Sequence, residues 1–205
     1  EIIKTTAVAE KTIDMTGLTT VTTAYVSGIY DDTAASVAAD LNVASTSGDA
    51  GINFTSANAS GNLILGDAVA QSGQIGTENT GTSAGDTAEA GGIALDLNAS
   101  IDNGSNAVTI TMIDNVDITG GAGGATANAT GTIGGAGGAG IDANQYETVN
   151  IILSATDTTA DVITINGGAG GNAVHAGGTT GAKGKDFIIG DNGTINITET
   201  LAATS

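Results

Sequence analysis

The side chains in this sequence that could do chemistry are almost all carboxylates. The chain contains 16 Asp and 6 Glu against four Lys and one His, it has no Arg and no Cys, and its formal charge is −18. Ca²⁺ prefers oxygen ligands, and such an excess of carboxylates attracts cations. The composition therefore favours cation binding over covalent chemistry.

Catalytic sites are hard to build from these residues. His175 is the only histidine and lies in a Gly/Ala-rich segment, where an exposed loop side chain is expected rather than a member of a Ser-His-Asp triad. A single His without any Cys makes no cluster for zinc or iron. Paired carboxylates could hydrolyse glycosides, but the Asp residues are scattered over turn-like segments and five aromatic residues offer little to stack on sugars. We expect that the protein is not an enzyme.

Phosphate and nucleic-acid binding are disfavoured as well. The stretch 164–198 combines many glycines with Lys183 and Lys185, but a phosphate-binding loop needs a helix N-terminus aimed at the anion, and here strands follow the glycines. Nucleic acids and anionic membranes require a basic face, which this acidic chain does not offer. The sequence has no apolar run of about 18 residues, so membrane insertion is not expected either.

The composition predicts an all-β fold. Val, Ile and Thr together number 65, and 33 Gly occur without any Pro, which is too rich in strand formers for a solvated linker. We expect the glycines at turns between strands. With five aromatic residues, the core must be filled by small branched side chains, as in the narrow interior of a β-solenoid. The predicted architecture is a β-solenoid or a solenoid-like β-sandwich with long Gly-rich loops.

An internal repeat supports this architecture. The segments "DITGGAGG" and "TINGGAGG" place the same glycine run at Gly120 and Gly167, 47 residues apart. The dipeptide Asn-Ile returns 30 residues after the first run, at Asn150, and 29 residues after the second, at Asn196. Two landmarks at nearly equal spacing indicate a duplicated unit of strand, glycine loop and strand, and residues 63–92 resemble a third copy.

The chain is expected to divide into two parts at residue 60. Residues 1–60 form an N-terminal β segment with one short helix over residues 31–45, where an Asp precedes apolar residues at helical spacing. Residues 61–205 form a repeat-like β region with Gly-rich returns. The clearest strands predicted there are residues 62–65, 93–101, 107–119, 147–155, 161–166 and 194–198.

Three stretches resemble the RTX-type nonapeptide G-G-x-G-x-D-x-U-x, in which U is a large apolar residue. They are "GGAGIDANQ" (137–145), "GGAGGNAVH" (167–175) and "GAKGKDFII" (181–189), and each departs from the pattern at one position. In proteins with this repeat the glycines turn tightly, and Asp side chains of successive turns enclose Ca²⁺. The resemblance covers roughly residues 115–200.

This resemblance implies a Ca²⁺ site in the C-terminal half of the chain. The first stretch has the Asp of the pattern at Asp142, the second has Asn172 in its place, and the third has Asp186. The ligands that the resemblance implies are Asp142, Asn172, Asp186 and Asp191. The alternative is that these stretches are glycine-rich turns without a metal.

A second resemblance points to the cell exterior. The segment "YETVNIILSATDTTADVITINGGAGG" (146–171) is similar to segments of RTX-type bacterial surface-layer proteins and related large secreted β-rich proteins. That family implies Ca²⁺-dependent β-solenoids that assemble into arrays outside the cell. Because the sequence begins at Glu1 rather than Met, we expect a processed product whose export signal has been removed.

These observations favour a secreted structural subunit that self-assembles into an extracellular surface layer, sheath or filament. The expected partner is a second copy, bound through residues 1–11, a β-prone segment that carries two of the four Lys and can add a strand to a neighbour's sheet edge. The same segment could instead pair within its own chain. The alternative function is an extracellular binding module, an adhesin or an ice-binding β-solenoid, which Thr-rich segments such as residues 16–25 favour.

Overall fold

A computed structural model of the protein describes strands from residue 11 to residue 200. The part of the chain that it describes contains 14 β-strands and no helix, so the all-β prediction is confirmed. The described residues are 11–14, 23–26, 29–30, 52–56, 60–65, 69–73, 75–76, 78–79, 85–99, 106–126, 132–156, 161–173, 175, 177–189 and 193–200.

The strands form three sheets, and neighbouring strands in each sheet are parallel. Sheet A contains, in spatial order, β14 (Thr194–Thr200), β11 (Thr148–Ser154), β8 (Ala107–Ile113), β5 (Ser60–Leu65) and β2 (Thr23–Val26). Sheet B contains β1 (Lys11–Asp14), β4 (Ile52–Ser56), β7 (Leu95–Ala99), β10 (Ile141–Ala143) and β13 (Phe187–Ile189). Sheet C contains β12 (Ile163–Asn166), β9 (Val116–Thr119), β6 (Val69–Ser72) and β3 (Ile29–Tyr30).

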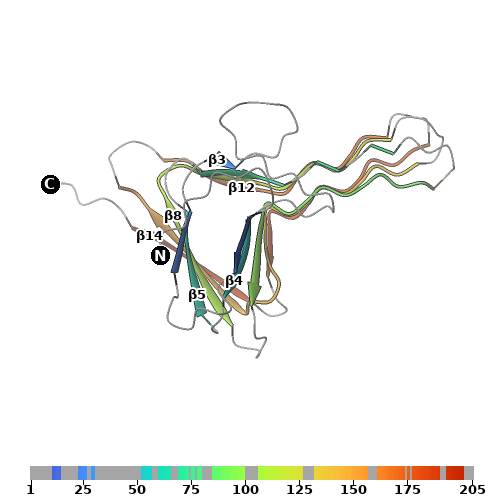
Figure 1. The fold of residues 1–205 in the computed structure, drawn as a ribbon. Coiled ribbons are helices and arrows are strands. Elements are labelled where there is room, and N and C mark those ends of the chain that lie inside the picture. The colour runs from blue at the N-terminus through green and yellow to red at the C-terminus, as the bar shows by residue number, and fades with distance from the viewer. Residues whose placement is uncertain are drawn as a thin grey trace.

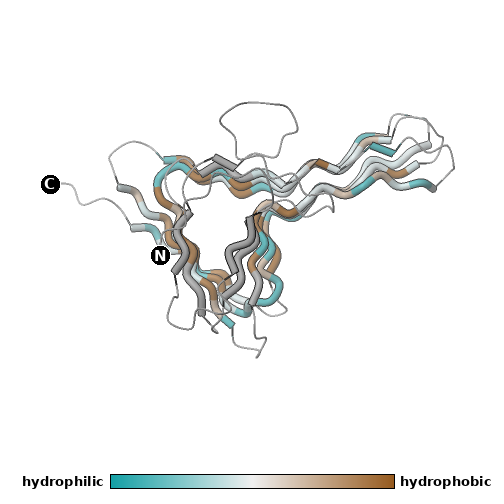
Figure 2. Tube along the Cα trace, in the orientation of Figure 1, coloured by the Kyte–Doolittle hydropathy of each residue, from teal (hydrophilic) through white to brown (hydrophobic). Residues whose placement is uncertain are grey.

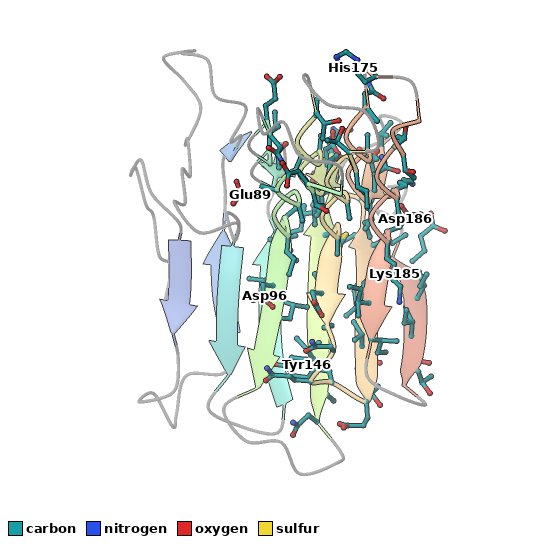
Figure 3. All side chains as sticks on the ribbon, turned by 90° about the vertical axis from the view of Figure 1, so that its right-hand side faces the viewer. Glu89, Asp96, Tyr146, His175, Lys185 and Asp186 are labelled. Carbon is teal, nitrogen blue, oxygen red and sulfur yellow. The ribbon has the colours of Figure 1, made fainter. Side chains whose placement is uncertain are left out.

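The three sheets lie as the walls of a triangular prism around a shared core (Figure 1). Each of the first four circuits contributes a strand to sheet B, then to sheet A, then to sheet C, and the last circuit adds β13 to sheet B and β14 to sheet A. Between sheet C and the following strand of sheet B, later circuits extend into a long arm that projects from the prism (Figure 1). Seen from the side, the strands stand in a row from the N-terminal to the C-terminal end (Figure 3).

The register of the strands confirms the internal repeat predicted from the sequence. Asn150 lies opposite Asn196, 46 residues later, and Thr119 lies opposite Asn166, 47 residues later. The two glycine runs directly follow Thr119 and Asn166, so they occupy equivalent positions in successive circuits. The third copy expected upstream stacks on them too, because the amide of Gly73 donates to the carbonyl of Thr119 at 2.9 Å.

Alternate side chains of the strands fill the core, as a strand period of two requires. In β8 the inward residues Val108, Ile110 and Met112 are fully buried, and burial of one such side chain stabilises the fold by about 1.5–3 kcal/mol. Figure 2 shows strongly hydrophobic positions along the walls of the prism and a pale tube along most of the arm. The buried cluster consists of Leu63, Leu65, Ala94, Leu95, Leu97, Val108, Ile110, Met112, Val116, Ile118, Ile141, Ala143, Tyr146, Val149 and Ile151.

One aromatic residue is fully buried among the side chains that the structure describes, and it is Tyr146. Burial raises the pKa of its phenol from 10.0 to about 12, because the charged phenolate would lose hydration. The main-chain amide of Tyr146 donates to the carbonyl of Ala143 at 3.0 Å, which closes the turn between β10 and β11. The rest of this core is aliphatic, as the scarcity of aromatic residues in the sequence predicted.

A sharp corner divides residues 107–119, predicted as one strand, into β8 and β9. At the corner Asp114 has a φ of 54°, in the left-handed region that Asp enters more readily than most residues. Its carboxylate accepts hydrogen bonds from the amide (2.6 Å) and the hydroxyl of Thr156 in the next circuit. The side-chain oxygen of Asn115 accepts one from the amide of Val162 at 3.1 Å. The Asp-Asn pair therefore turns the chain from sheet A to sheet C and ties the corner to the following circuit.

Some sequence-based expectations fall on residues that the structure does not describe. These are the short helix over residues 31–45 and the first ten residues of the expected assembly strand. The last residue of that strand, Lys11, begins β1 and pairs with Ile52 of β4 in the same chain. Within the described residues, no helix is long and apolar enough to cross a membrane.

Candidate functional site

The glycine-rich segments form the arm that leaves the prism between sheets C and B (Figure 1). In each of three circuits, one segment runs out from sheet C and one segment returns to sheet B. The outgoing segments start at Gly73, Gly120 and Gly167, and the returning segments end at Ala94, Gly140 and Asp186. The arm therefore has an outgoing layer and a returning layer.

Within each layer, every third residue donates its amide hydrogen to the equivalent segment of the next circuit. In the outgoing layer these bonds run, at 2.8–3.0 Å, from Gly120 to Asn166, from Gly123 to Ala169 and from Thr126 to Asn172. In the returning layer they run, at 2.8–3.0 Å, from Gly134 to Thr179, from Gly137 to Ala182 and from Gly140 to Lys185. A period of three is that of a polyproline II helix and differs from the period of two in the strands.

A second set of amides connects the two layers. Gly121 donates to the carbonyl of Gly92 at 2.9 Å, Gly138 donates to Gly121 at 2.8 Å, and Gly168 donates to Gly138 at 2.8 Å. In the two sets of bonds, the amides of two of every three residues are donors. The third residue takes part through its carbonyl and has room for a small side chain, as in the exposed Ala136, whose carbonyl accepts from Gly91 at 2.8 Å.

Glycine is required in the arm because neighbouring segments lie too close for a side chain. A Cβ at Gly138 would stand 1.9 Å from the carbonyl oxygen of Gly92, which no real contact allows. Positive φ angles, which mark tight glycine turns, occur among the described glycines at Gly85 and Gly177 alone. The expectation that the glycines serve turns is therefore wrong for the arm, where they allow main chains to approach each other closely.

The residues that the resemblance implied as Ca²⁺ ligands lie in different parts of the molecule. Asp142 is in the middle of β10, opposite Asp96 of β7, and its Oδ1 accepts the amide hydrogen of Asn144 at 3.0 Å. Asn172 is exposed near the end of an outgoing arm segment, and Asp191 lies outside the described residues. Among the residues described, no group of three or more His, Asp or Glu side chains could hold a metal, and Ca²⁺ binding stays a prediction.

The third of these ligands, Asp186, closes the base of the arm. Its Oδ1 accepts the amide hydrogen of Gly167 and the ammonium of Lys183, both at 2.8 Å. The hydrogen bond from Gly167 and, after it, that from Lys183 hold the pKa of this carboxyl below its usual value. The carboxylate thus joins the start of the last outgoing segment to the end of the last returning one. Figure 3 places Asp186 and Lys185 at the C-terminal end of the row of strands.

His175 lies where the last arm segment turns back, and its side chain is exposed at the edge of the molecule (Figure 3). Its main-chain carbonyl accepts a hydrogen bond from the amide of Gly178 at 3.0 Å. The expectation of an exposed loop side chain is confirmed.

A groove of about 240 Å³ lies at the C-terminal end of the prism, beside β12. Its lining combines the acidic residues Asp114, Asp161 and Glu199 with the apolar residues Leu153, Ala155 and Ile163. Acidic and apolar side chains side by side suit a ligand that is itself apolar and carries a positive charge.

Sequence reasoning did not find this groove, because its acidic residues come from three separate segments. For Glu199 the register gives an explanation. Glu199 of β14 pairs with Leu153 of β11, and Leu153 pairs with Met112 of β8. Met112 is fully buried, so Glu199 is an acidic residue in a column of core positions. Side chains alternate between the two faces along residues 194–200, so the sequence places Glu199 on the same face as Ile195 and Ile197. A charged residue on the core face of a strand indicates that the strand lies at the edge of a sheet.

The core is uncovered at the C-terminal end. All seven residues of β14 are exposed, although Ile195 and Ile197 lie in register with the buried Val149 and Ile151 of β11. The exposed fractions of Ile195 and Ile197 are 40% and 67%. Both residues therefore stand at core positions, on a strand with no described neighbour on its other side. An apolar strand edge of this kind recruits further strands.

The outer face of sheet A has no charged residue on β8, β11 and β14. It is formed mainly by Thr and Asn, among them Thr109, Thr111, Asn150, Asn196 and Thr198. The side-chain amide of Asn196 donates to the side-chain oxygen of Asn150 at 2.9 Å. In a chain with a formal charge of −18, this face is a separate neutral surface.

Comparison with known proteins gives no relative for this chain. No protein-family model matches it, and no curated protein or solved structure is similar to it above the level of chance. The strands, the arm and the groove are therefore the basis of a functional proposal.

Proposed function

We propose that the chain is a parallel β-solenoid and serves as a secreted structural subunit, which self-assembles into an extracellular surface layer, sheath or filament. The support is topological, because three parallel sheets receive their strands in chain order and each circuit lies on the one before it. Such a stack has no intrinsic end, since each outer strand can accept another parallel strand.

The observation that carries this proposal is the uncovered C-terminal end of the prism. β12, β13 and β14 are the edge strands of their sheets, and Ile197 of β14 is 67% exposed at a core position. Covering apolar surface stabilises an association by about 25 cal/mol per Å² before the entropic cost of binding. A second copy of the chain supplies such a cover.

In this proposal the protein acts without catalysis. Acidic residues that could have served as catalysts have structural contacts: Asp114 binds Thr156, and Asp186 binds Gly167 and Lys183. These contacts hold corners and arm segments in place, as a structural subunit requires.

Ca²⁺ is the proposed stabilising ion, because a chain with a formal charge of −18 repels itself unless cations bind to it. The RTX resemblance implies that Asp142, Asn172, Asp186 and Asp191 take part. At Asp186 a bound Ca²⁺ has to replace the ammonium of Lys183, which lies 2.8 Å from Oδ1.

Assembly is tested by negative-stain microscopy and light scattering of the purified chain over a range of concentrations. Regular particles much larger than the 19.6 kDa monomer are expected. Dialysis against a chelator, with the ionic strength matched by sodium chloride, should lower the melting temperature or dissociate the particles. Monomers at every concentration contradict self-assembly, whereas an unchanged melting temperature and particle size after chelation contradict the role of Ca²⁺ alone.

The position of the ion is tested by calorimetric Ca²⁺ titration of Asp142→Ala and Asp186→Ala. Both variants should bind Ca²⁺ more weakly than the parent. Asp117→Ala is the matched control, because Asp117 is an exposed strand residue whose carboxylate accepts from Thr119 at 3.0 Å. Equal affinity in all four proteins would assign these loops a structural role only.

The alternative function, an extracellular binding module, is favoured by one observation, the neutral Thr/Asn face of sheet A. An adhesin or an ice-binding protein needs a flat surface that does not repel its target, and Thr109, Thr111 and Thr198 lie on such a surface. Ice recrystallisation assays and glycan arrays test it. Thr111→Lys should abolish any activity found, whereas Thr164→Lys in sheet C should leave it intact.

A further inference from the structure

The three sheets differ in strand number at the C-terminal end. Sheets A and B have five strands each, whereas sheet C has four in the part of the chain that the structure describes. The last circuit contributes β13 and β14, but no described strand to sheet C. No described residue therefore occupies the next position in sheet C, alongside β12, and the groove with Asp114, Asp161 and Glu199 reaches Ile163 at the start of β12.

Residues 1–10 come directly before a strand of sheet B, which is the place that strands of sheet C have in the sequence. In every later circuit a strand of sheet C comes directly before a strand of sheet B, as β3 before β4, β6 before β7, β9 before β10 and β12 before β13. Because β1 belongs to sheet B, the residues before it stand where a strand of sheet C is expected. Their sequence, "EIIKTTAVAE", is rich in strand formers and contains neither Gly nor Pro.

We propose that residues 1–10 of one copy bind as a parallel strand alongside β12 of a second copy, so that copies stack head to tail and all three sheets continue across the junction. β1 and β2 of the incoming copy then add to β13 and β14. Main-chain hydrogen bonds supply much of the affinity, as in other cases of strand addition. This inference rests on the proposed self-assembly and names the two surfaces that carry it.

The distribution of charge favours contact between the two ends. Residues 12–182 contain 17 of the 22 acidic residues and no Lys. Residues 1–11 have no net charge and residues 183–205 have a formal net charge of −1, because all four Lys lie in these terminal segments. All four Lys side chains therefore lie in the segments that enter or flank an end-to-end junction, where they reduce the repulsion between two acidic copies.

Lys4 is the residue of the incoming segment that can pair with the groove. Residues 1–10 carry Glu1 and Glu10 at their ends and one cation, Lys4, between them, and the groove presents Asp114, Asp161 and Glu199. Residues 201–205, which follow β14 in the same chain, are the competing occupant of this position, but they contain no Lys. Lys4 therefore gives residues 1–10 of a second copy a contact with the acidic lining that residues 201–205 cannot make.

Stacking in this way also covers the exposed core. Ala24 of β2 lies in register with Leu63, and the same column continues through Ile110 and Ile151 to Ile197. If the column continues across the junction, Ala24 of the incoming copy takes the position next to Ile197. The residue with the largest apolar exposure at this end then becomes part of a continuous core.

The stacking is tested with a pair of engineered cysteines, because the chain contains none. Thr23 and Asn196 belong to one register column, which runs through Asn62, Thr109 and Asn150. Head-to-tail stacking places Thr23 of the incoming copy about 4.8 Å from Asn196, a separation that a disulfide spans. Within one copy the two positions are four strands apart, roughly 19 Å, which a disulfide does not span.

Under mild oxidation, the variant Thr23→Cys/Asn196→Cys should give a ladder of covalent multimers on a denaturing gel. The control Thr23→Cys/Asn150→Cys places the second cysteine one strand further in, about 9.6 Å away, and should give none. Dimers from Thr23→Cys alone or Asn196→Cys alone indicate head-to-head or tail-to-tail contact and overturn the proposal. Assemblies visible by microscopy without a ladder from the double variant overturn it as well, but leave self-assembly standing.

The incoming strand is tested by removing residues 1–10. The shortened chain should keep its circular dichroism spectrum, stay monomeric in light scattering and bind a synthetic peptide of the sequence EIIKTTAVAE. In the full chain, Lys4→Glu should raise the concentration needed for assembly about tenfold. Lys185→Glu makes the same change of charge at the same end of the prism but outside the lining of the groove, and should raise this concentration less than Lys4→Glu does.

Each negative result contradicts a different part of the proposal. If the shortened chain with the two cysteines still forms the ladder, another segment, such as residues 201–205, fills the position beside β12, and the role of residues 1–10 is overturned. Equal effects of Lys4→Glu and Lys185→Glu overturn the pairing of Lys4 with the groove. A full chain that stays monomeric at all concentrations contradicts the proposed self-assembly, and this inference with it.

Discussion

The core and the arm stack on the same repeat, but different atoms hold them together. In the core, side chains such as Ile110 are fully buried between three sheets. In the arm, the contacts are made by main chains, and the carbonyl oxygen of Gly92 lies 1.9 Å from the place where a Cβ at Gly138 would stand. The core is stabilised by the packing of buried side chains. The arm requires glycine, because a side chain would prevent the close approach of its main chains.

This difference decides what each region tolerates. A core strand uses alternate residues for packing, so its outer positions are free to vary, as the Thr, Asn and Ile residues on the outer face of sheet A illustrate. In an arm segment, two of every three residues donate their amide hydrogens to neighbouring segments, and the third has room for a small side chain. Substitutions should therefore have a period of two in their effects on the core and a period of three in their effects on the arm.

The largest effect is expected in the core. Ile110→Ala removes a fully buried side chain from the middle of β8 and should lower the free energy of unfolding by about 2–5 kcal/mol. Thr111→Ala, one residue further and partly exposed, should cost less than about 1 kcal/mol. Urea denaturation followed by circular dichroism measures both. Equal losses would show that alternation along β8 does not set its stability.

The core should also lose stability at alkaline pH through Tyr146. Burial raises the pKa of this phenol from 10.0 to about 12, so below pH 10 it is neutral in the folded and the unfolded chain and its contribution is fully present. As the pH rises through 12 this contribution, about 3 kcal/mol, is lost, because the unfolded chain ionises first. Denaturation of the parent and of Tyr146→Phe over this range measures it. Parallel curves for the two proteins would contradict the assignment.

A smaller effect is expected in the arm. Gly138→Ala forces the returning segment away from Gly92 and should favour local opening by about 1–3 kcal/mol. Hydrogen exchange should accelerate at the amide of Gly168, which donates to Gly138, and stay unchanged in β8. Ala136→Ser, at an exposed position of the same segment, is the control and should alter neither. Faster exchange throughout the chain would show that arm and core open together.

The smallest effect is expected at the base of the arm in acid. Gly167 and Lys183 hold the pKa of Asp186 below the usual value of 3.8, so their stabilising effect is present above that value and is lost as the pH falls through the folded-state pKa. Since Asp186 is exposed, the effect is local. Exchange at the amide of Gly167 should accelerate in acid in the parent but not in Asp186→Asn. If Asp142→Asn behaves like Asp186→Asn, the change does not come from this contact.

Much of the architecture could be predicted from local patterns. Residues 107–119 and 147–155, which are rich in strand formers, were predicted as strands, and β8, β9 and β11 lie within these ranges. The spacing of the glycine runs predicted the repeat that the register confirms. Both are properties of short stretches or of regular spacing, which a single sequence contains.

The candidate site could not be predicted in the same way. Asp114, Asp161 and Glu199 line one groove although they come from three segments of the chain. Their meeting depends on where the corner at Asp114 turns the chain, and that corner lies within residues that a hydrophobic pattern joins into one strand. The left-handed conformation of Asp114 changes the direction of the chain, and so the place in space of every residue after it. The pattern of apolar residues in the sequence does not reveal this change of direction.

The sequence by itself determined that this protein is made of strands, that its two matching glycine runs are 47 residues apart and that its four Lys lie in its terminal segments. Composition and net charge are sums over residues, and spacing is a difference of residue numbers, so all three can be obtained from the sequence without coordinates. The tertiary structure alone decided that the glycines build a layered arm rather than turns, and that sheet C has one strand fewer than sheets A and B among the described residues. Both depend on which main chains lie side by side, and this follows from the packing of successive circuits against one another.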